Sequence, residues 1–135
     1  DEESALWFHD AARPVVSQRI LADIALALQT HRAVTVAVPV TETLYRVERW
    51  RASAGENEWK VESVPSRSEY MRAQTPQAFH MEIVANAYMK AIADEAVIAT
   101  DDVGIVRKYA PKEPIYIVEG EEENRKITFA QDLKA

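Results

Sequence analysis

The chain has 135 residues, of which 47% are apolar and 28% charged, so it can bury a core and has the composition of one globular domain or part of a larger one. Sixteen basic and twenty-two acidic residues give a net charge of −6, which argues against a broad nucleic-acid-binding face. Without cysteine there can be no disulfide or thiolate metal site, and no apolar stretch is long enough for a membrane span. The first residues, Asp1–Ser4, lack the basic start and the apolar run of a signal peptide. We therefore expect a cytoplasmic location and neither nucleic-acid nor membrane partners.

The first third of the chain predicts a strand, a helix and a second strand. Ala5–Phe8 is a short apolar run typical of a buried strand, and it ends at two polar residues. Ser17 can cap a helix, and Ala33–Val40 is a valine-rich strand with alternating valines. This order favours a crossover unit and a parallel sheet. The apolar face of the predicted helix consists of Ile20, Leu21, Ile24, Ala25 and Leu28.

Residues 41–72 are polar, and they predict a β-hairpin that projects from the sheet as an arm. Its strands are expected over Thr43–Arg51 and Glu58–Val64, on either side of a turn at Ala54–Asn57. Aromatic residues on such an arm often become buried against a partner subunit. The aromatic residues of this stretch are Tyr45, Trp50, Trp59 and Tyr70.

The C-terminal half predicts further helices and strands. Thr75-Pro76 resembles a helix start, because proline fits the first helical position. Thr100 can cap another helix, with two aspartates in its first turn. Ile115–Val118 and Lys126–Phe129 are predicted strands, and Ala130–Ala135 is the predicted beginning of a helix.

Charged residues provide several candidate site groups. Asp10 follows a predicted strand, where a carboxylate could hold Mg²⁺, although its position alone favours a turn cap. Arg13 is expected to pin the loop through carboxylate or carbonyl contacts. One carboxylate of Glu121–Glu123 could join Asp10 at a magnesium ion. Arg67 and Lys126 are candidate phosphate-binding cations, each more often a surface residue when taken alone.

Other kinds of site find little support. The three glycines are widely separated, so they cannot build a glycine-rich cradle for nucleotide phosphates. The three histidines lack the spacing of zinc ligands. No nucleophile-elbow motif supports hydrolase chemistry.

Five segments, in order, resemble the motifs of the 2-C-methyl-D-erythritol 4-phosphate cytidylyltransferase family. The sequences HDAARP, PVTET, QTPQAF, TDD and ENRKIT resemble that family's HDAARP, PVTDT, QTPQAF, TDD and DNIKIT. Together the segments extend over nearly the whole chain. They are His9–Pro14, Pro39–Thr43, Gln74–Phe79, Thr100–Asp102 and Glu123–Thr128.

The resemblance implies an α/β fold with a Rossmann-like nucleotidyltransferase sheet, mostly parallel and three-layered, with a projecting β-hairpin arm. Residues 1–135 would be the C-terminal portion of one such domain, with the arm at about 41–72. Asp10 falls where the family binds the CTP–magnesium unit, and Ala11 and Ala12 match backbone that lines the nucleotide site. Glu123 replaces the usual aspartate, and it is a second candidate magnesium ligand.

The resemblance also assigns residues to the acceptor. Thr43, Arg67 and Thr75 match positions that hold the acceptor's phosphate and polyol, and the arm residues among them would act in the partner subunit of a homodimer. Lys126 matches a lysine that places the acceptor phosphate for attack. Arg67 and Lys126 are therefore the expected catalytic residues. Tyr45 stands where the family often has lysine.

Three functions follow as alternatives. The Ala11-Ala12 pair favours CMP transfer to 2-C-methyl-D-erythritol 4-phosphate in isoprenoid precursor synthesis. Pro65–Tyr70 and the longer hairpin favour ribitol 5-phosphate as the acceptor, which would make the product CDP-ribitol. The family's N-terminal glycine-rich loop has no counterpart in these residues, so the third alternative is a non-catalytic dimerising fragment. The 135 residues alone are expected to be inactive.

Overall fold

The computed structural model describes residues 4–51, 57–98 and 101–134, and the chain divides into two compact units. The first unit comprises Asp1–Val38 and Ala73–Ala135, and it contains the central sheet and the α-helices. The second unit, Pro39–Arg72, contains a β-hairpin. Within the described ranges, no helix has the length and apolar character needed to cross a bilayer.

A four-stranded sheet forms the centre of the first unit, with its strands in the order β1-β5-β2-β6. Its strands are β1 (Ala5–Phe8), β5 (Met71–His80), β2 (Ala33–Pro39) and β6 (Tyr116–Glu119). β1 pairs with β5 in the antiparallel sense, whereas β2 and β6 are parallel. Because it contains both kinds of pair, the sheet is mixed. β5 lies between β1 and β2, so these two strands do not pair directly.

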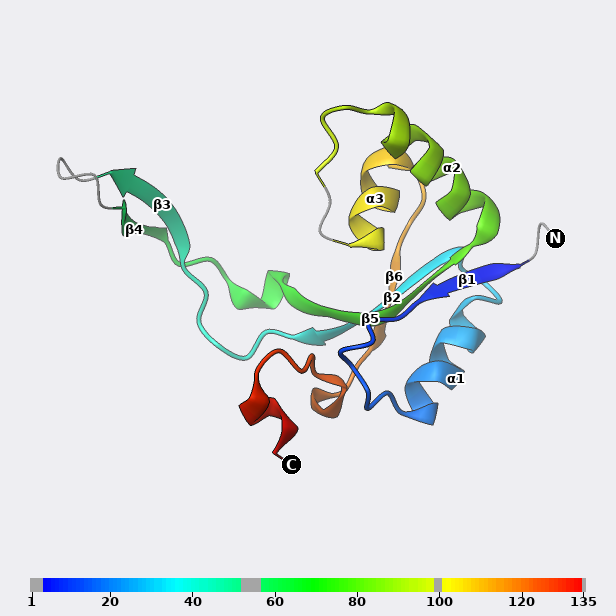
Figure 1. Cartoon of the computed structure of the whole chain (residues 1–135), viewed down its shortest axis with the longest axis horizontal. Helices are drawn as coiled ribbons and strands as arrows, with labels where there is room; N and C mark the ends of the chain where they lie inside the picture. Colours follow the sequence, from blue (N-terminus) through cyan, green and yellow to red (C-terminus); the bar gives the residue numbers. More distant parts are fainter. Residues whose placement is uncertain (1–3, 52–56, 99–100, 135) are drawn as a thin grey trace. The chain divides into compact units, whose positions relative to one another are not determined.

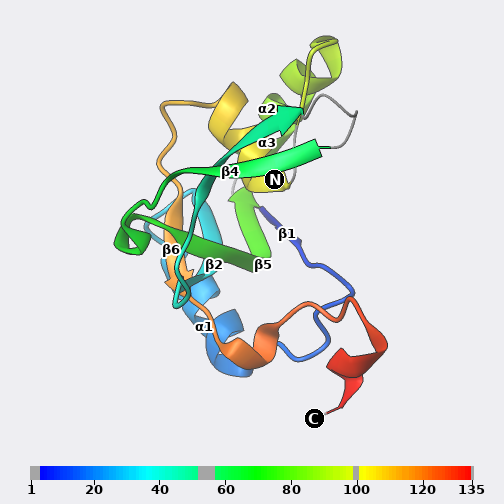
Figure 2. The ribbon, with the colours of Figure 1, turned by 90° about the vertical axis from the view of Figure 1, so that its left-hand side faces the viewer.

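Helices cover both faces of this sheet, as Figures 1 and 2 show from two directions. α1 (Gln18–Ala27) lies on one side, and α2 (Met81–Ala93) and α3 (Asp102–Tyr109) lie on the other. The predicted three-layer, Rossmann-like α/β fold is confirmed.

Two apolar clusters fill the spaces between the layers. Because successive side chains of a strand point to opposite faces, β2 contributes Ala33 to one cluster and Val34 and Val36 to the other. The cluster with α2 and α3 is made of Ala33, Phe79, Val84, Ala87, Ala91, Ile105 and Val106. The cluster with α1 is made of Ile20, Ile24, Val34, Val36, Ala78 and Val118.

Two of the helices begin with side-chain caps. The predicted cap of α1 is confirmed, because Ile20 N donates to Ser17 Oγ at 3.2 Å. In α3 the cap is Asp101, whose Oδ1 accepts from Gly104 N at 2.8 Å. Thr100, the predicted cap of this helix, lies outside the described residues.

The hairpin of the second unit confirms the two predicted strands. β3 (Arg46–Arg51) and β4 (Asn57–Ser63) pair in the antiparallel sense, with a register shift near Arg46. The short 3₁₀ helix η1 (Arg67–Glu69) follows the hairpin. Residues 54–56 of the predicted turn lie outside the described ranges.

The helix predicted to begin at Thr75-Pro76 is wrong. Both residues belong to β5, and α2 begins only at Met81. Proline also suits a strand where its missing N–H is not needed, and here the pairing of β5 with β1 begins at the next residue, Gln77. Ala78 and Phe79 then enter the two opposite clusters, which requires the strand's period of two.

Three smaller predictions also need correction. Lys126–Phe129 is not a strand; within it, Ile127 N donates to Ala12 O at 2.8 Å. β1 is not buried, because it is an edge strand and leaves Leu6 and Trp7 each 38% exposed. The predicted C-terminal helix is a single 3₁₀ turn, η3 (Ala130–Leu133), in the described residues.

Candidate active site

Three of the predicted site residues meet just beyond the carboxyl end of β1. Asp10 N donates to Thr75 Oγ1 at 3.0 Å, and Lys126 Nζ lies 3.4 Å from Asp10 Oδ2. These residues are far apart in the chain: Thr75 follows Asp10 by 65 positions, and Lys126 follows Thr75 by 51. The fold therefore places a carboxylate, a hydroxyl and an ammonium group together at one edge of the sheet.

Asp10 shapes a turn as well as presenting its charge. Its Oδ1 accepts from Ala12 N at 3.0 Å, and its carbonyl accepts from Arg13 N at 2.9 Å. This is the turn cap that position alone favoured. The hydrogen bond from Ala12 N, with smaller contributions from Lys126 and Arg13, lowers the pKa of Asp10. The carboxylate is therefore ionised at neutral pH while Oδ2 faces Lys126.

Arg13 pins the same turn to two other segments. Its Nη1 donates to Asn124 O at 2.8 Å, and its Nη2 donates to Ala73 O at 3.4 Å. The prediction that Arg13 holds the loop through carbonyl contacts is confirmed.

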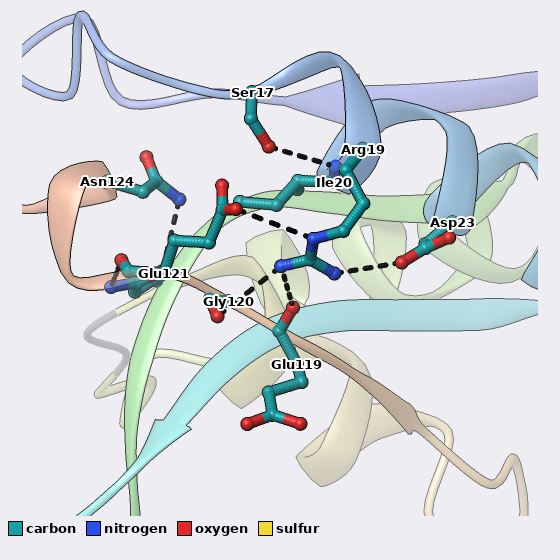
Figure 3. A network of polar contacts seen from close by, with 9 residues as sticks. Ser17, Arg19, Ile20, Asp23, Glu119, Gly120, Glu121 and Asn124 are labelled. Carbon is teal, nitrogen blue, oxygen red and sulfur yellow. Dashed lines mark hydrogen bonds and ion pairs between the residues drawn. The ribbon is translucent and has the colours of Figure 1, made fainter.

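A second arginine anchors the acidic loop that follows β6 (Figure 3). Arg19 Nη2 donates to Glu119 O at 3.0 Å, and its Nε lies 3.4 Å from Glu121 Oε2. Arg19 Nη1 also pairs with Asp23 at 2.8 Å, which fixes the guanidinium on α1. Glu121 is thus engaged by an arginine, which makes it a poorer magnesium ligand than its sequence position suggests.

Glu123, the other candidate magnesium ligand, is an exposed residue of the short helix η2 (Glu122–Asn124). It lines a cavity of about 460 Å³ together with Pro14, Val15 and Asp132, and Asp10 is not part of that lining. In the parts of the chain that are described, no three His, Asp or Glu side chains gather as a metal-binding group. The structure therefore places Asp10 as a carboxylate at the site, and the magnesium role of Glu123 stays a prediction.

His9 links the 10–13 turn to β5. Its Nε2 donates to Arg13 O at 2.8 Å, and its Nδ1 accepts from Thr75 Oγ1 at 3.0 Å in the tautomer that satisfies both contacts. The ring therefore connects two segments of the site and has both nitrogens engaged.

Thr43 and Arg67 belong to the second unit. Both side chains are exposed, and Arg67 Nη1 donates to Thr41 O at 2.6 Å. This contact lies within the second unit, so the roles of both residues at the site stay predictions.

Two buried side-chain amides, which were not predicted from the sequence, connect these segments. Asn124 Nδ2 donates to Thr75 O at 2.8 Å and to Gln74 Oε1 at 3.1 Å. Gln74 Nε2 in turn donates to Glu121 O at 2.9 Å. Both residues lie inside motifs that carried the resemblance, and that membership is the one signal in the sequence that pointed to them.

The arrangement suits the binding of an anion better than covalent chemistry. Lys126 supplies a cation that could bind a phosphate, and it lies beside an ionised carboxylate that could hold a nucleotide-bound magnesium ion.

Comparison with known proteins adds the family context. The family profile described as "IspD: 2-C-methyl-D-erythritol 4-phosphate cytidylyltransferase" matches residues 1–135. The 2-C-methyl-D-erythritol 4-phosphate cytidylyltransferase of Thermobifida fusca is 42% identical over 133 residues, which are 98% of this chain and 52% of that protein. The ribitol-5-phosphate cytidylyltransferase of Lactiplantibacillus plantarum is 34% identical over the same shares of the two chains.

Solved structures agree with this relationship. The 2-C-methyl-D-erythritol 4-phosphate cytidylyltransferase of Thermus thermophilus matches with a TM-score of 0.76 at 31% identity, over 96% of this chain and 58% of that chain. The enzyme of the same name from Francisella tularensis matches with a TM-score of 0.81 at 25% identity, over 99% and 58%. The chain spans about half the length of these relatives.

Proposed function

The chain belongs to the 2-C-methyl-D-erythritol 4-phosphate cytidylyltransferase (IspD) family, and from this premise we propose that its protein transfers CMP from CTP to a sugar-alcohol phosphate. The observation that carries the proposal is the contact of Lys126 with Asp10 at 3.4 Å, beside Thr75. In this proposal Lys126 would meet the acceptor phosphate, and the neighbouring Asp10 would hold the CTP–magnesium unit.

The reaction is an in-line attack by an acceptor phosphate oxygen on the α-phosphorus of CTP. One phosphorus–oxygen bond forms as the bond to the departing pyrophosphate breaks, so no protein nucleophile is needed. The two reactants are both anions and repel each other. Lys126 and Arg67 would offset that repulsion and hold the acceptor phosphate in line.

The remaining residues would position the reactants. Thr43 and Thr75 would hold the acceptor, whose phosphate meets Lys126, while Ala11 and Ala12 would line the nucleotide site through their backbone. The Ala12 N–H donates to Asp10 Oδ1 at 3.0 Å, so this stretch of backbone is held in the turn beside Asp10.

Magnesium fits this site as a partner of the substrate. Asp10 has a lowered pKa, so an ionised carboxylate is present, and Mg²⁺ on nucleotides usually takes one or two protein carboxylates with substrate phosphates and water completing its shell. Bound there, it would neutralise charge on the triphosphate. Asp10 would hold it, and Glu123 is retained only as a secondary ligand.

The acceptor of first choice is 2-C-methyl-D-erythritol 4-phosphate, as in the name of the 42% identical relative. Ribitol 5-phosphate is the second candidate, favoured by the 34% identical relative of that name. The location proposed for either reaction is the cytoplasm, where CTP is available.

The protein is proposed to work as a homodimer joined through the hairpin arm. Support comes from one face of the hairpin, where Val47, Trp59 and Val61 are 46%, 64% and 56% exposed. Cross-strand pairing places Val47 opposite Val61 and Arg49 opposite Trp59, so these side chains share a face. An apolar face of this kind suits a partner surface. Arg67 and Thr43 would then serve the partner's site.

A non-catalytic, dimerising role remains the alternative for these 135 residues, because their scattered glycines cannot cradle a triphosphate. The test is pyrophosphate release by the intact protein with CTP, Mg²⁺ and each acceptor in turn. Release with one of the two acceptors supports the proposal and identifies the substrate. Release with neither acceptor would reject it and leave the non-catalytic role.

A further inference from the structure

Asn124 is the most deeply buried polar residue of the loop that carries Lys126. Asn124 is 0% exposed, and it contacts two other segments. Its Nδ2 donates to Thr75 O and to Gln74 Oε1, and its own carbonyl accepts from Arg13 Nη1 at 2.8 Å. One residue therefore joins the loop both to β5 and to the turn that carries Asp10.

The contact of Lys126 with Asp10 is too weak to hold the loop by itself. The Lys126 side chain is 55% exposed and its Nζ lies 3.4 Å from the carboxylate. Exposed ion pairs of this kind contribute little, because solvent screens them and two flexible side chains must be ordered. The position of the ammonium group must therefore depend on the backbone beneath it.

Two anchors bracket that backbone. Two residues before Lys126, the buried side chain of Asn124 fixes the loop to Thr75 O at 2.8 Å. One residue after it, Ile127 N donates to Ala12 O at 2.8 Å. Both anchors attach to segments that also carry the other site residues, Thr75 and Asp10. Displacing the first anchor would therefore move Lys126 relative to those residues.

We propose that Asn124 is a positioning residue, whose side chain holds Lys126 against Asp10 by tying the loop 120–126 to β5. The inference deepens the proposed cytidylyl transfer and rests on it for its kinetic consequence. Asn124 touches no reactant in this account, so its effect on the reaction passes through Lys126.

The geometric part is tested without any turnover. Intact protein is treated briefly with acetic anhydride, and acetylation of Lys126 is measured by mass spectrometry relative to Lys112. Asn124→Ala should raise the relative reactivity of Lys126 about two- to fivefold, the scale for releasing an exposed ion pair. Asp10→Asn should raise it by a similar factor. Asn124→Ser, a milder change, serves if the alanine variant does not fold.

A control separates positioning from general destabilisation. Val84 is buried in the cluster with α2 and α3, so Val84→Ala should lower stability without touching the loop. It should leave the Lys126 reactivity at the wild-type value. Unchanged Lys126 reactivity in a folded Asn124 variant, or an equal rise in Val84→Ala, would overturn the inference.

The kinetic part is a double-mutant cycle. Asn124→Ala should lower kcat about 10- to 100-fold, as expected for a small misplacement of a reacting group. In a Lys126→Ala background the same substitution should have little further effect, because its target is already gone. A full, additive loss in that background would mean that Asn124 does not act through Lys126. If the wild-type protein shows no transfer, the proposed function fails, and the acetylation result still decides the role of Asn124.

Discussion

Gly120 has no room for a side chain. A Cβ at this position would stand 2.2 Å from Gln74 Oε1 and 2.8 Å from Val36 Cγ1. The loop after β6 can therefore reach Gln74 only because this residue is glycine. The requirement is one of space between the loop and two neighbouring strands.

We expect Gly120→Ala to destabilise the fold by about 1–3 kcal/mol, the usual cost of overpacking. Gln74 must move, which also disturbs its bond from Asn124 Nδ2. Urea denaturation of the intact protein measures the change. Gly104→Ala is the matched control, because the nearest atom to a Cβ there is the side-chain Oδ1 of Asp101 at 3.2 Å. Alanine also has a higher helix propensity than glycine. Equal stability of the two variants would contradict this reading of Gly120.

Sequence resemblance located Asp10, Thr75 and Lys126 but not the buried amides that connect their segments. Asp10 lies 3.0 Å from Thr75 through its N–H and 3.4 Å from Lys126 through its carboxylate. Glu123 was paired with Asp10 because it stands where the family has an aspartate, whereas in the structure it lines a cavity whose lining does not include Asp10. Asn124 was missed because a buried hydrogen-bonding role depends on tertiary contacts that no local pattern encodes.

At the scale of elements, α2 and α3 are joined by two phenol–carboxylate hydrogen bonds. Tyr88 on α2 donates to Asp102 on α3, and Tyr109 on α3 donates to Asp94, the C-cap of α2, at 2.5 Å. Burial raises the pKa of Tyr88 to about 12, and the bond to Asp94 raises the pKa of Tyr109 to about 12. The two bonds connect the helices near both ends of α3.

These shifts predict a loss of stability at alkaline pH. An unfolded tyrosine loses its proton near pH 10.0, whereas the folded protein keeps it until about 12. Below pH 10 the stabilisation is fully present, and between 10 and 12 the free energy of unfolding should fall as pH rises. Tyr88→Phe should make that fall shallower, as measured by urea denaturation at several pH values. Tyr70→Phe is the control, and an unchanged slope in Tyr88→Phe would contradict the prediction.

Local patterns predicted those elements whose own residues decide their structure. The alternating valines of Ala33–Pro39 gave a strand, and Ser17 gave a helix start, because periodicity and capping are local properties. Pro76 lies in a strand although a helix start was predicted, since proline suits both a helix start and a strand position at which no N–H has to donate. Lys126–Phe129 has the composition of a strand, but it pairs with no strand in the described structure.

At the scale of the whole molecule, the hairpin of β3 and β4 leaves large apolar side chains exposed. Trp59 is 64% exposed, and the guanidinium of Arg49 lies over its ring, with Cζ 5.8 Å from the ring centroid. A two-stranded hairpin is marginal by itself in water. A partner surface over the face with Val47, Trp59 and Val61 would supply the missing burial.

We expect the intact protein to be a dimer that Trp59→Glu weakens by at least about 30-fold in Kd, the scale of an interface hot spot. Light scattering after size-exclusion chromatography over a range of concentrations measures this. Glu58→Gln, whose side chain points to the other face of the hairpin, is the control. A Trp59→Glu variant with the wild-type mass at every concentration would show that this face is not the interface.

We propose that Lys126 of one subunit and Arg67 of the other serve the same acceptor phosphate. Each single variant, Arg67→Ala and Lys126→Ala, should lose about 10²-fold or more in turnover, the scale for one preorganised donor. The two variants are inactive for different reasons, so they can complement each other. In a mixed dimer, one site would combine an intact Lys126 with the partner's intact Arg67.

The decisive measurement is therefore pyrophosphate release after the two inactive variants are mixed in equal amounts and allowed to exchange subunits. Random exchange makes half the dimers mixed, each with one intact site of two, so activity should recover to about a quarter of wild type. Recovery of that size would support a site shared between subunits. Activity that stays at the level of the separate variants, with subunit exchange demonstrated, would contradict it.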